Sequence, residues 1–119
     1  MQKFDITKRC FEFGAQIVKL VNKLPKTPAG FAIANQIIRS GTSIGANTVE
    51  AQDASSKKEF IRVMTIALKE CRETLYWLAL IDKTKLLPVL EIEACLNEGK
   101  QIRLILASIV RNAKLNSSL

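Results

Sequence analysis

Histidine is absent from this chain of 119 residues, and with it the side chain that most often serves as a general base or a metal ligand. The other polar residues form no nucleophile–base pair and no cluster with the spacing of metal ligands. The sequence therefore predicts a protein that is not an enzyme and that requires no metal and no cofactor.

Cysteine and long apolar runs are also scarce. Cys10, Cys71 and Cys95 have no C-x-x-C spacing and fall among apolar residues at helical spacing, which favours buried thiols over redox or metal chemistry. The first residues lack the apolar core of a secretory signal, and the longest strongly apolar stretch, 104–110, is too short to span a bilayer. We expect a soluble, cytoplasmic protein with no membrane partner.

Proline and glycine are few, and no segment alternates in the manner of a strand. Apolar residues instead recur at steps of three and four, the pattern of amphipathic helices. We predict helices over about 6–24, 28–53, 56–83 and 88–114. The short connections favour an all-α, single-domain fold, an antiparallel up-down-up-down four-helix bundle.

Two of these helices have recognisable starts. Thr27 is placed to cap the second helix, with Pro28 at its first position. Ser56 and Glu59 have the spacing of a capping box at the start of the third helix. The last four residues, NSSL, are expected to form a polar tail.

The stretch RSGTSIGANTVEA, residues 39–51, holds loop-forming residues inside the second predicted helix. It is not a phosphate-binding loop, because no strand precedes it and no Gly-Lys-Ser/Thr follows. Gly41 and Gly45 lie four residues apart, so they predict a groove in which a neighbouring helix comes close.

The opposite face of this helix carries a polar stripe, defined as Arg39, Ser43, Asn47 and Glu50. We interpret the stripe as structural, with hydrogen bonds along the helix and to a neighbour. Glu70 or Glu73 is the predicted partner of Arg39. A Lys or Arg near the start of the third helix is the predicted partner of Glu50.

The formal net charge is +7 and the pI about 9.6, which makes nucleic acid a plausible partner. No run of five like charges occurs, so folding or assembly must gather the cations. The first and third segments carry most of the excess charge. Our candidates for nucleic-acid binding are Lys19, Lys23, Lys57, Lys58 and Arg62; a solvated surface cation is the alternative for each.

Three large apolar residues of the third helix, Ile66, Trp77 and Leu80, fall on its nominally polar side. A second apolar face predicts a contact between subunits. A single exposed aromatic residue is common, and this alternative stays open for Trp77.

Residues 36–81 resemble the signature of the small four-helix bundle proteins encoded in intervening sequences of bacterial large-subunit ribosomal RNA genes. The motifs RSGTSIGAN…EA, SKKEF and ALKECRETLYWL occur in the family's order and spacing. Some branches have proline where Gly45 stands, and a bulkier residue where Thr48 stands. The resemblance implies a ring-like homopentamer. It also implies kinship with the basic accessory proteins of diversity-generating retroelements, which work with nucleic acid and a reverse transcriptase.

Three functions follow from these observations. The first is a homo-oligomeric, basic bundle that binds the RNA or DNA backbone through Lys and Arg patches. The second is a structural or adaptor protein whose partner is another protein. The third is an enzyme that uses the polar stripe with Glu70 or Glu73, which the absence of histidine disfavours.

Overall fold

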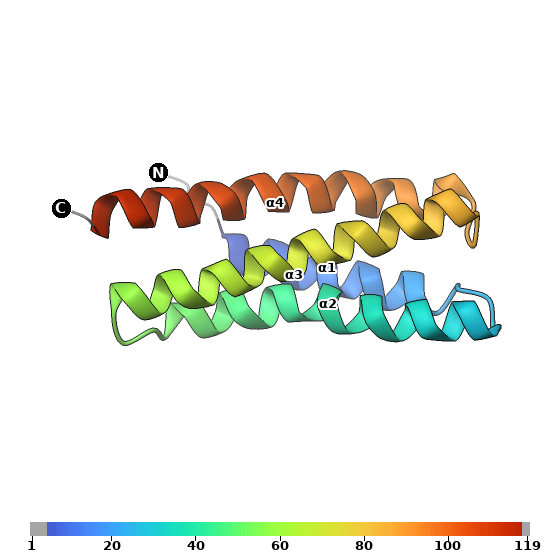
Figure 1. Ribbon diagram of the computed structural model, residues 1–119, viewed down its shortest axis with the longest axis horizontal. Coiled ribbons are helices and arrows are strands. Elements are labelled where there is room, and N and C mark those ends of the chain that lie inside the picture. Colours follow the sequence, from blue (N-terminus) through green and yellow to red (C-terminus); the bar gives the residue numbers. More distant parts are fainter. Residues whose placement is uncertain (1–4, 118–119) are drawn as a thin grey trace.

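The computed structural model describes residues 5–117, and this part of the chain consists of four helices and their connections, without strands. The helices are α1 (Ile6–Val21), α2 (Pro28–Gln52), α3 (Lys57–Thr84) and α4 (Val89–Ser117). Successive helices run in opposite directions (Figure 1), so the predicted up-down-up-down bundle is confirmed. The bundle is elongated, with extents of 51 × 27 × 20 Å.

Two helix ends differ from the predicted bounds. Helix α1 stops at Val21 rather than Leu24, because the backbone N–H groups of Lys23 and Leu24 bond three residues back and form a tight turn. Helix α4 continues to Ser117, so the part of the expected polar tail that the structure describes is helical. No proline or glycine stands there to end the helix.

Side-chain oxygens cap three of the helices. Asp5 accepts a hydrogen bond from the N–H of Lys8, and Thr27 accepts one from Gly30, with Pro28 at the first position of α2 as predicted. Ser56 accepts the N–H of Glu59 at 3.1 Å, which is one half of the predicted capping box.

The other half of the capping box is absent from the described bonds. The carboxylate of Glu59 pairs with Arg62 one turn along α3, at 2.9 Å, rather than turning back to the backbone of Ser56. The carboxylate of Glu59 therefore accepts from the guanidinium of Arg62 and not from the backbone N–H of Ser56.

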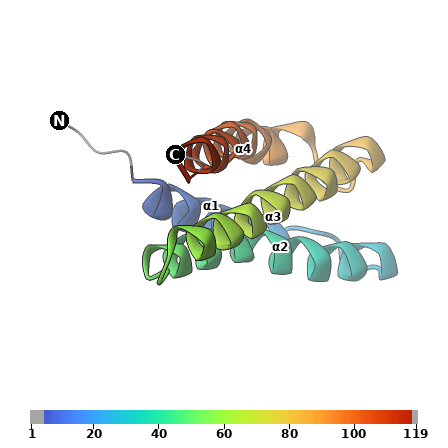
Figure 2. The ribbon, with the colours of Figure 1, turned by 60° about the vertical axis from the view of Figure 1, so that its left-hand side comes forward.

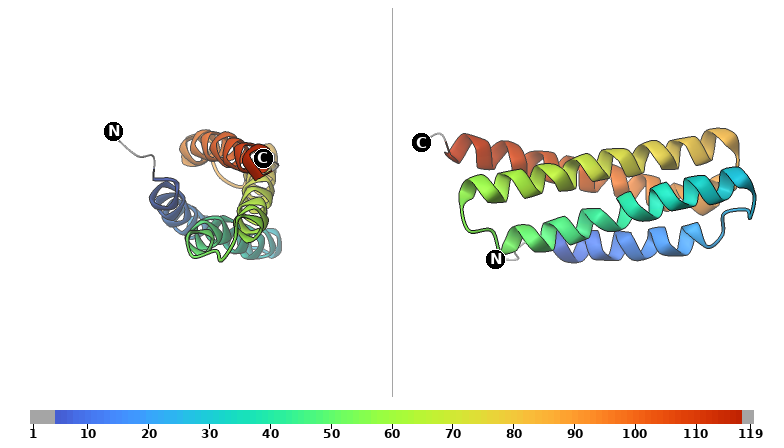
Figure 3. Two further views of the ribbon diagram at one scale, coloured as in Figure 1. Left: turned by 90° about the vertical axis from the view of Figure 1, so that its left-hand side faces the viewer. Right: turned by 60° about the horizontal axis from the view of Figure 1, so that its bottom comes forward.

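Each helix packs on two neighbours. Helix α3 lies between α2 and α4 (Figures 1 and 2), and α1 completes the ring next to α2 and α4 (Figure 3, left). The seam between α1 and α4 is the least closely packed of the four helix–helix contacts. Two ion pairs cross it: Arg9 with Glu98, at 2.6 Å, and Lys23 with Glu91, at 2.6 Å.

The glycines of α2 allow α1 to approach closely, as predicted. A Cβ on Gly45 would lie 3.3 Å from the backbone carbon of Cys10, and a Cβ on Gly41 would lie 2.9 Å from the side chain of Ile17. Gly14 on α1 faces the same crossing with more room, because its Cβ would meet atoms only at 3.8 Å.

Gly30 has a different role, in the connection that leads into α2. A Cβ at this position would lie 1.8 Å from the carbonyl oxygen of Pro25, so the chain closes its turn through the space that a side chain would fill. No side chain larger than hydrogen fits there without a movement of the backbone.

Candidate nucleic-acid interface

The five cations predicted to bind nucleic acid do not form one surface. Lys57, Lys58 and Arg62 begin α3, whereas Lys19 lies in the last turn of α1 and Lys23 just beyond it. Since α1 and α3 point the same way along the bundle, the end of α1 and the start of α3 lie at opposite ends of the long axis (Figure 1).

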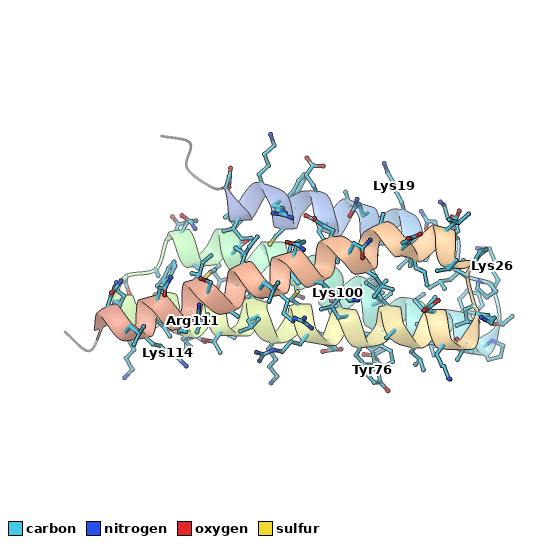
Figure 4. The ribbon with its side chains drawn as sticks, turned by 90° about the horizontal axis from the view of Figure 1, so that it is seen from above. Lys19, Lys26, Tyr76, Lys100, Arg111 and Lys114 are labelled. Atoms are coloured by element: carbon cyan, nitrogen blue, oxygen red, sulfur yellow. The ribbon has the colours of Figure 1, made fainter. Side chains whose placement is uncertain are left out.

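Two of these five cations have acidic partners. Lys23 pairs with Glu91 on α4, and Arg62 pairs with Glu59 within α3. Lys19, Lys57 and Lys58 are exposed. Figure 4 shows Lys19 on α1, away from the side of α4 that faces α3.

A longer basic surface runs along the outside of α3. Eight exposed residues, spaced alternately four and three apart, share one face of this helix. In order they are Lys58, Arg62, Thr65, Lys69, Arg72, Tyr76, Ala79 and Lys83. Five of them are cations and none is acidic, and from the first to the last they cover about 37 Å at about 1.5 Å per residue. We call this set the α3 basic stripe.

Helix α4 adds four cations beside the stripe: Lys100, Arg103, Arg111 and Lys114. Figure 4 shows Lys100, Arg111 and Lys114 on the side of α4 that faces α3. We call these four residues, together with the α3 basic stripe, the α3/α4 basic face. Its α4 part contains none of the predicted residues.

Over the C-terminal half of α3, the basic face is hollowed into a groove of about 630 Å³ between α3 and α4. The rim holds four cations and one acid, and the remaining lining is aromatic or aliphatic. The lining residues are Arg72, Lys83, Lys100, Arg103 and Asp82 on the rim, with Leu75, Tyr76, Ala79 and Leu96. The groove thus presents positive charge around an apolar floor.

Tyr76 is 60% exposed in this groove, and its neighbour Trp77 supports it from the side. The two ring centroids lie 5.0 Å apart, with the planes at 77°, an edge-to-face contact. Trp77 is half-buried and packs against the core, and its indole N–H donates to Glu73 Oε2 at 3.1 Å. The aromatic pair therefore rests on a side chain that is fixed on two sides.

The predicted pairing of Arg39 with α3 is confirmed. Its Nη1 donates to Glu70 at 3.2 Å, and its Nη2 donates to Glu73. This ion pair is the main reason that the pKa of Glu73 lies below its usual value, with the hydrogen bond from Trp77 adding to the effect. Arg39 is half-exposed, so the cluster lies at the surface of the α2–α3 contact.

The rest of the polar stripe bonds mainly to its own helix. Ser43 donates to the carbonyl of Arg39 at 2.6 Å, and Asn47 donates to the carbonyl of Ser43 at 2.8 Å. Glu50 is exposed and acts on Arg62 through longer-range attraction, which adds to the larger effect of Glu59 in raising the pKa of Arg62. The predicted cation near the start of α3 is therefore a distant partner of Glu50.

The predicted subunit-contact residues, Ile66, Trp77 and Leu80, are half-buried within the single chain. More exposed apolar surface lies over α1 and α2. There Phe11 is 71% exposed, and with Val18 and Val49 it borders an apolar groove of about 630 Å³. This surface was not predicted from the sequence, because the small residues of α2 indicated only packing inside the bundle.

The three cysteines are buried free thiols, as predicted. Burial raises the pKa of Cys10 to about 12 and that of Cys71 to about 11, and it also raises the pKa of Cys95. Such thiols stay protonated and do not act as nucleophiles at neutral pH.

Within residues 5–117, no group of three acidic, Cys or His side chains is placed to hold a metal ion. None of the helices in this part combines the length and apolar composition needed to cross a bilayer.

Comparison with known proteins identifies the family. The family model for the 23S rRNA-intervening sequence protein matches residues 2–108. A solved structure, of a protein of unknown function from the S23 ribosomal protein family of Bacteroides thetaiotaomicron, is similar with a TM-score of 0.83 and 40% identity. The similarity covers 89% of this chain and 98% of that one. No curated protein matches. The match over nearly the whole chain agrees with the motifs at residues 36–81, and the chain therefore belongs to the 23S rRNA-intervening sequence protein family.

Proposed function

We propose that this protein is a non-enzymatic, nucleic-acid-binding bundle that holds the phosphate backbone of RNA or DNA on the α3/α4 basic face. The observation that carries the proposal is the α3 basic stripe, in which five cations and no acid follow one helix face. A row of cations of this kind displaces counterions from a polyanion, and the released counterions drive binding.

Two further observations support this function. The net charge of +7 favours encounter with polyanions, although net charge by itself does not define a site. The family's name refers to 23S rRNA, which makes RNA a reasonable first ligand to test.

The test is a titration of duplex and single-stranded nucleic acid across a series of salt concentrations. We expect the logarithm of the affinity to fall linearly with the logarithm of salt, with a slope of about −0.9 per phosphate contacted in a DNA duplex. The triple variant Lys69→Ala, Arg72→Ala, Lys83→Ala should weaken binding and flatten this slope.

The control variant removes the same charge elsewhere. Lys8, Lys19 and Lys26 are exposed and lie outside the basic face, on α1 and the connection that follows it. Their triple replacement by alanine should leave most of the affinity in place. Equal losses in the two variants would mean that net charge, and not the basic face, determines binding.

We also propose that the protein acts as a homo-oligomer, which the family resemblance implies to be a pentamer. The exposed apolar groove over α1 and α2, with Phe11 at its border, supports self-association because apolar surface of this kind favours contacts between proteins. Assembly on the α1/α2 side would leave the basic face of each copy open to a ligand.

The second candidate function is an adaptor that binds another protein. The same apolar groove favours it, because a helix of a partner could pack there. A reverse transcriptase is a candidate partner by family analogy alone. Failure to bind any nucleic acid at low salt, together with an intact fold, would favour this second function.

A further inference from the structure

The α3 basic stripe contains an exposed aromatic ring that phosphate binding does not require. Tyr76 lies between the cations Arg72 and Lys83 on the same face of α3. Phosphates are bound by charge and by hydrogen-bond donors, whereas an aromatic face binds the flat face of a base. The position of this ring therefore indicates a ligand that contains flat bases as well as phosphates.

The surroundings of the ring fit such a ligand. The groove beside Tyr76 has an aliphatic floor that includes Leu75 and Leu96, and cations from both helices stand at its rim. A flat ring can lie against the apolar floor while the phosphates on either side meet the cations. Figure 4 shows Lys100 on the α3 side of α4 and Tyr76 on the outer side of α3, so the two helices contribute to one surface.

The ring is also held in place before any ligand arrives. Tyr76 packs edge-to-face on Trp77, and Trp77 is fixed by its hydrogen bond to Glu73, which Arg39 pairs with in turn. An ordered platform loses little side-chain freedom on binding, and this raises its affinity for a stacked base.

We propose that this groove binds a single-stranded segment of nucleic acid, with one unpaired base stacked on Tyr76 and the adjacent phosphates on the cations of the rim. This inference rests on the proposed function and specifies its ligand. In a duplex the faces of the bases are covered by the neighbouring bases, so Tyr76 cannot stack on them. Only the cations would then contact a duplex. Unpaired RNA and unpaired DNA share the required chemistry.

The experiment compares the wild type with Tyr76→Leu and Tyr76→Phe. Fluorescence anisotropy would measure the binding of labelled oligouridylate and oligothymidylate of about 12 nucleotides, and of a duplex of the same length, a size within the usual range for such sites. We expect Tyr76→Leu to weaken single-strand binding about five-fold or more and to leave duplex binding unchanged. Tyr76→Phe keeps the ring and should retain the wild-type affinity.

Trp77 provides a second readout, because it is the only tryptophan of the chain and touches the Tyr76 ring. Unlabelled oligothymidylate should change its emission in the wild type and in Tyr76→Phe, while the duplex should not. A stronger effect with oligouridylate than with oligothymidylate would assign the site to RNA, and the reverse order would assign it to DNA.

The outcomes separate this inference from the proposed function. Absence of binding to all three nucleic acids would overturn both. Salt-dependent binding that is equal in the wild type and Tyr76→Leu would overturn only the stacking of a base. Equal loss of duplex and single-strand affinity in Tyr76→Leu would do the same, since the ring would then act without an unpaired base.

Discussion

At the scale of single residues, the close crossing of α1 and α2 depends on two glycines, Gly41 and Gly45, which have no side chain. The Cβ of any residue at Gly45 would press on the backbone of Cys10, and at Gly41 it would press on Ile17. The contact at Gly41 is the closer one, at 2.9 Å from the branched and buried side chain of Ile17, whereas the contact at Gly45 is with backbone at 3.3 Å, so neither position has room for a side chain without a shift.

We predict that Gly45→Leu and Gly41→Leu each lower the free energy of unfolding by about 1–3 kcal/mol, although leucine is the better helix former. Urea denaturation followed by circular dichroism measures this change. Gly14→Ala is the control, because its Cβ meets only ordinary contacts at 3.8 Å. It should be neutral or stabilising, by up to about 1 kcal/mol. A leucine variant more stable than the wild type would show that the helices can separate without cost.

Arg39 makes a different kind of contribution, through charge at the α2–α3 surface. We predict that Arg39→Ala lowers stability by less than Gly45→Leu does, because half of the Arg39 side chain is exposed and water screens the pair. Arg39 lowers the pKa of Glu73. The contribution of that carboxylate is therefore present above its ordinary pKa of about 4.5 and is lost as the pH falls through the lowered value in the folded protein.

Urea denaturation at pH 7 and at about pH 3 tests this linkage. The difference between the wild type and Arg39→Ala should shrink at the lower pH. A difference that stays the same at both values would mean that Arg39 acts through the packing of its carbon chain rather than its charge.

At the scale of the helices, the local sequence predicts most of what the structure contains. Apolar spacing located all four helices, and caps such as Thr27 located their starts, because these signals act within one or two turns. Features that depend on segments distant in the chain were not predicted. The contact of Gly30 with the carbonyl of Pro25 depends on how the turn folds back, which no periodicity encodes.

The candidate site divides in the same way. Lys58 and Arg62 were predicted from clustering along the chain, and they prove to be the first members of a stripe along α3. The four-three spacing that continues through Lys69 and Arg72 was present in the sequence and could have revealed the stripe. That Arg103 lies across a groove from Tyr76 could not be derived, because it depends on how α3 and α4 pack.

The seam between α1 and α4 carries a prediction of its own. Arg9 and Glu98 form two parallel hydrogen bonds, at 2.6 and 2.9 Å, across the thinnest contact of the bundle. In a double-mutant cycle with Arg9→Ala and Glu98→Ala, we expect a coupling free energy of about 1 kcal/mol, the upper part of the range for surface pairs. It should decrease with added salt. A coupling near zero would mean that apolar contacts alone close the seam.

At the scale of the whole molecule, charge and apolar surface lie over different pairs of helices. Cations line the groove over α3 and α4, while an apolar groove lies over α1 and α2. If the protein assembles and binds nucleic acid as proposed, this separation leaves one side for contact between copies and another for the ligand.

We predict that light scattering at micromolar concentration gives a homo-oligomer, with a mass near five chains if the family resemblance holds. Phe11→Lys should weaken assembly while leaving the fold intact, because the side chain is 71% exposed in the single chain. Trp77→Ala tests the contact predicted from sequence. Since Trp77 packs against the core, this variant should also lower the stability of the monomer. A mass of 13.3 kDa for the wild type would contradict the prediction.

The three buried thiols can report local opening of the folded protein. Cys10 lies on α1, Cys71 on α3 and Cys95 on α4, and each is closed to an alkylating reagent while its helix stays in the bundle. The order in which the three sulfurs become labelled therefore reports which contacts between helices open first, and Cys71, whose Sγ lies against Gly99 of α4, reports the contact between α3 and α4. Because α1 and α4 pack least closely, we expect Cys10 or Cys95 to be labelled before Cys71. Mass spectrometry of the wild-type protein, sampled at successive times of alkylation, would measure this order.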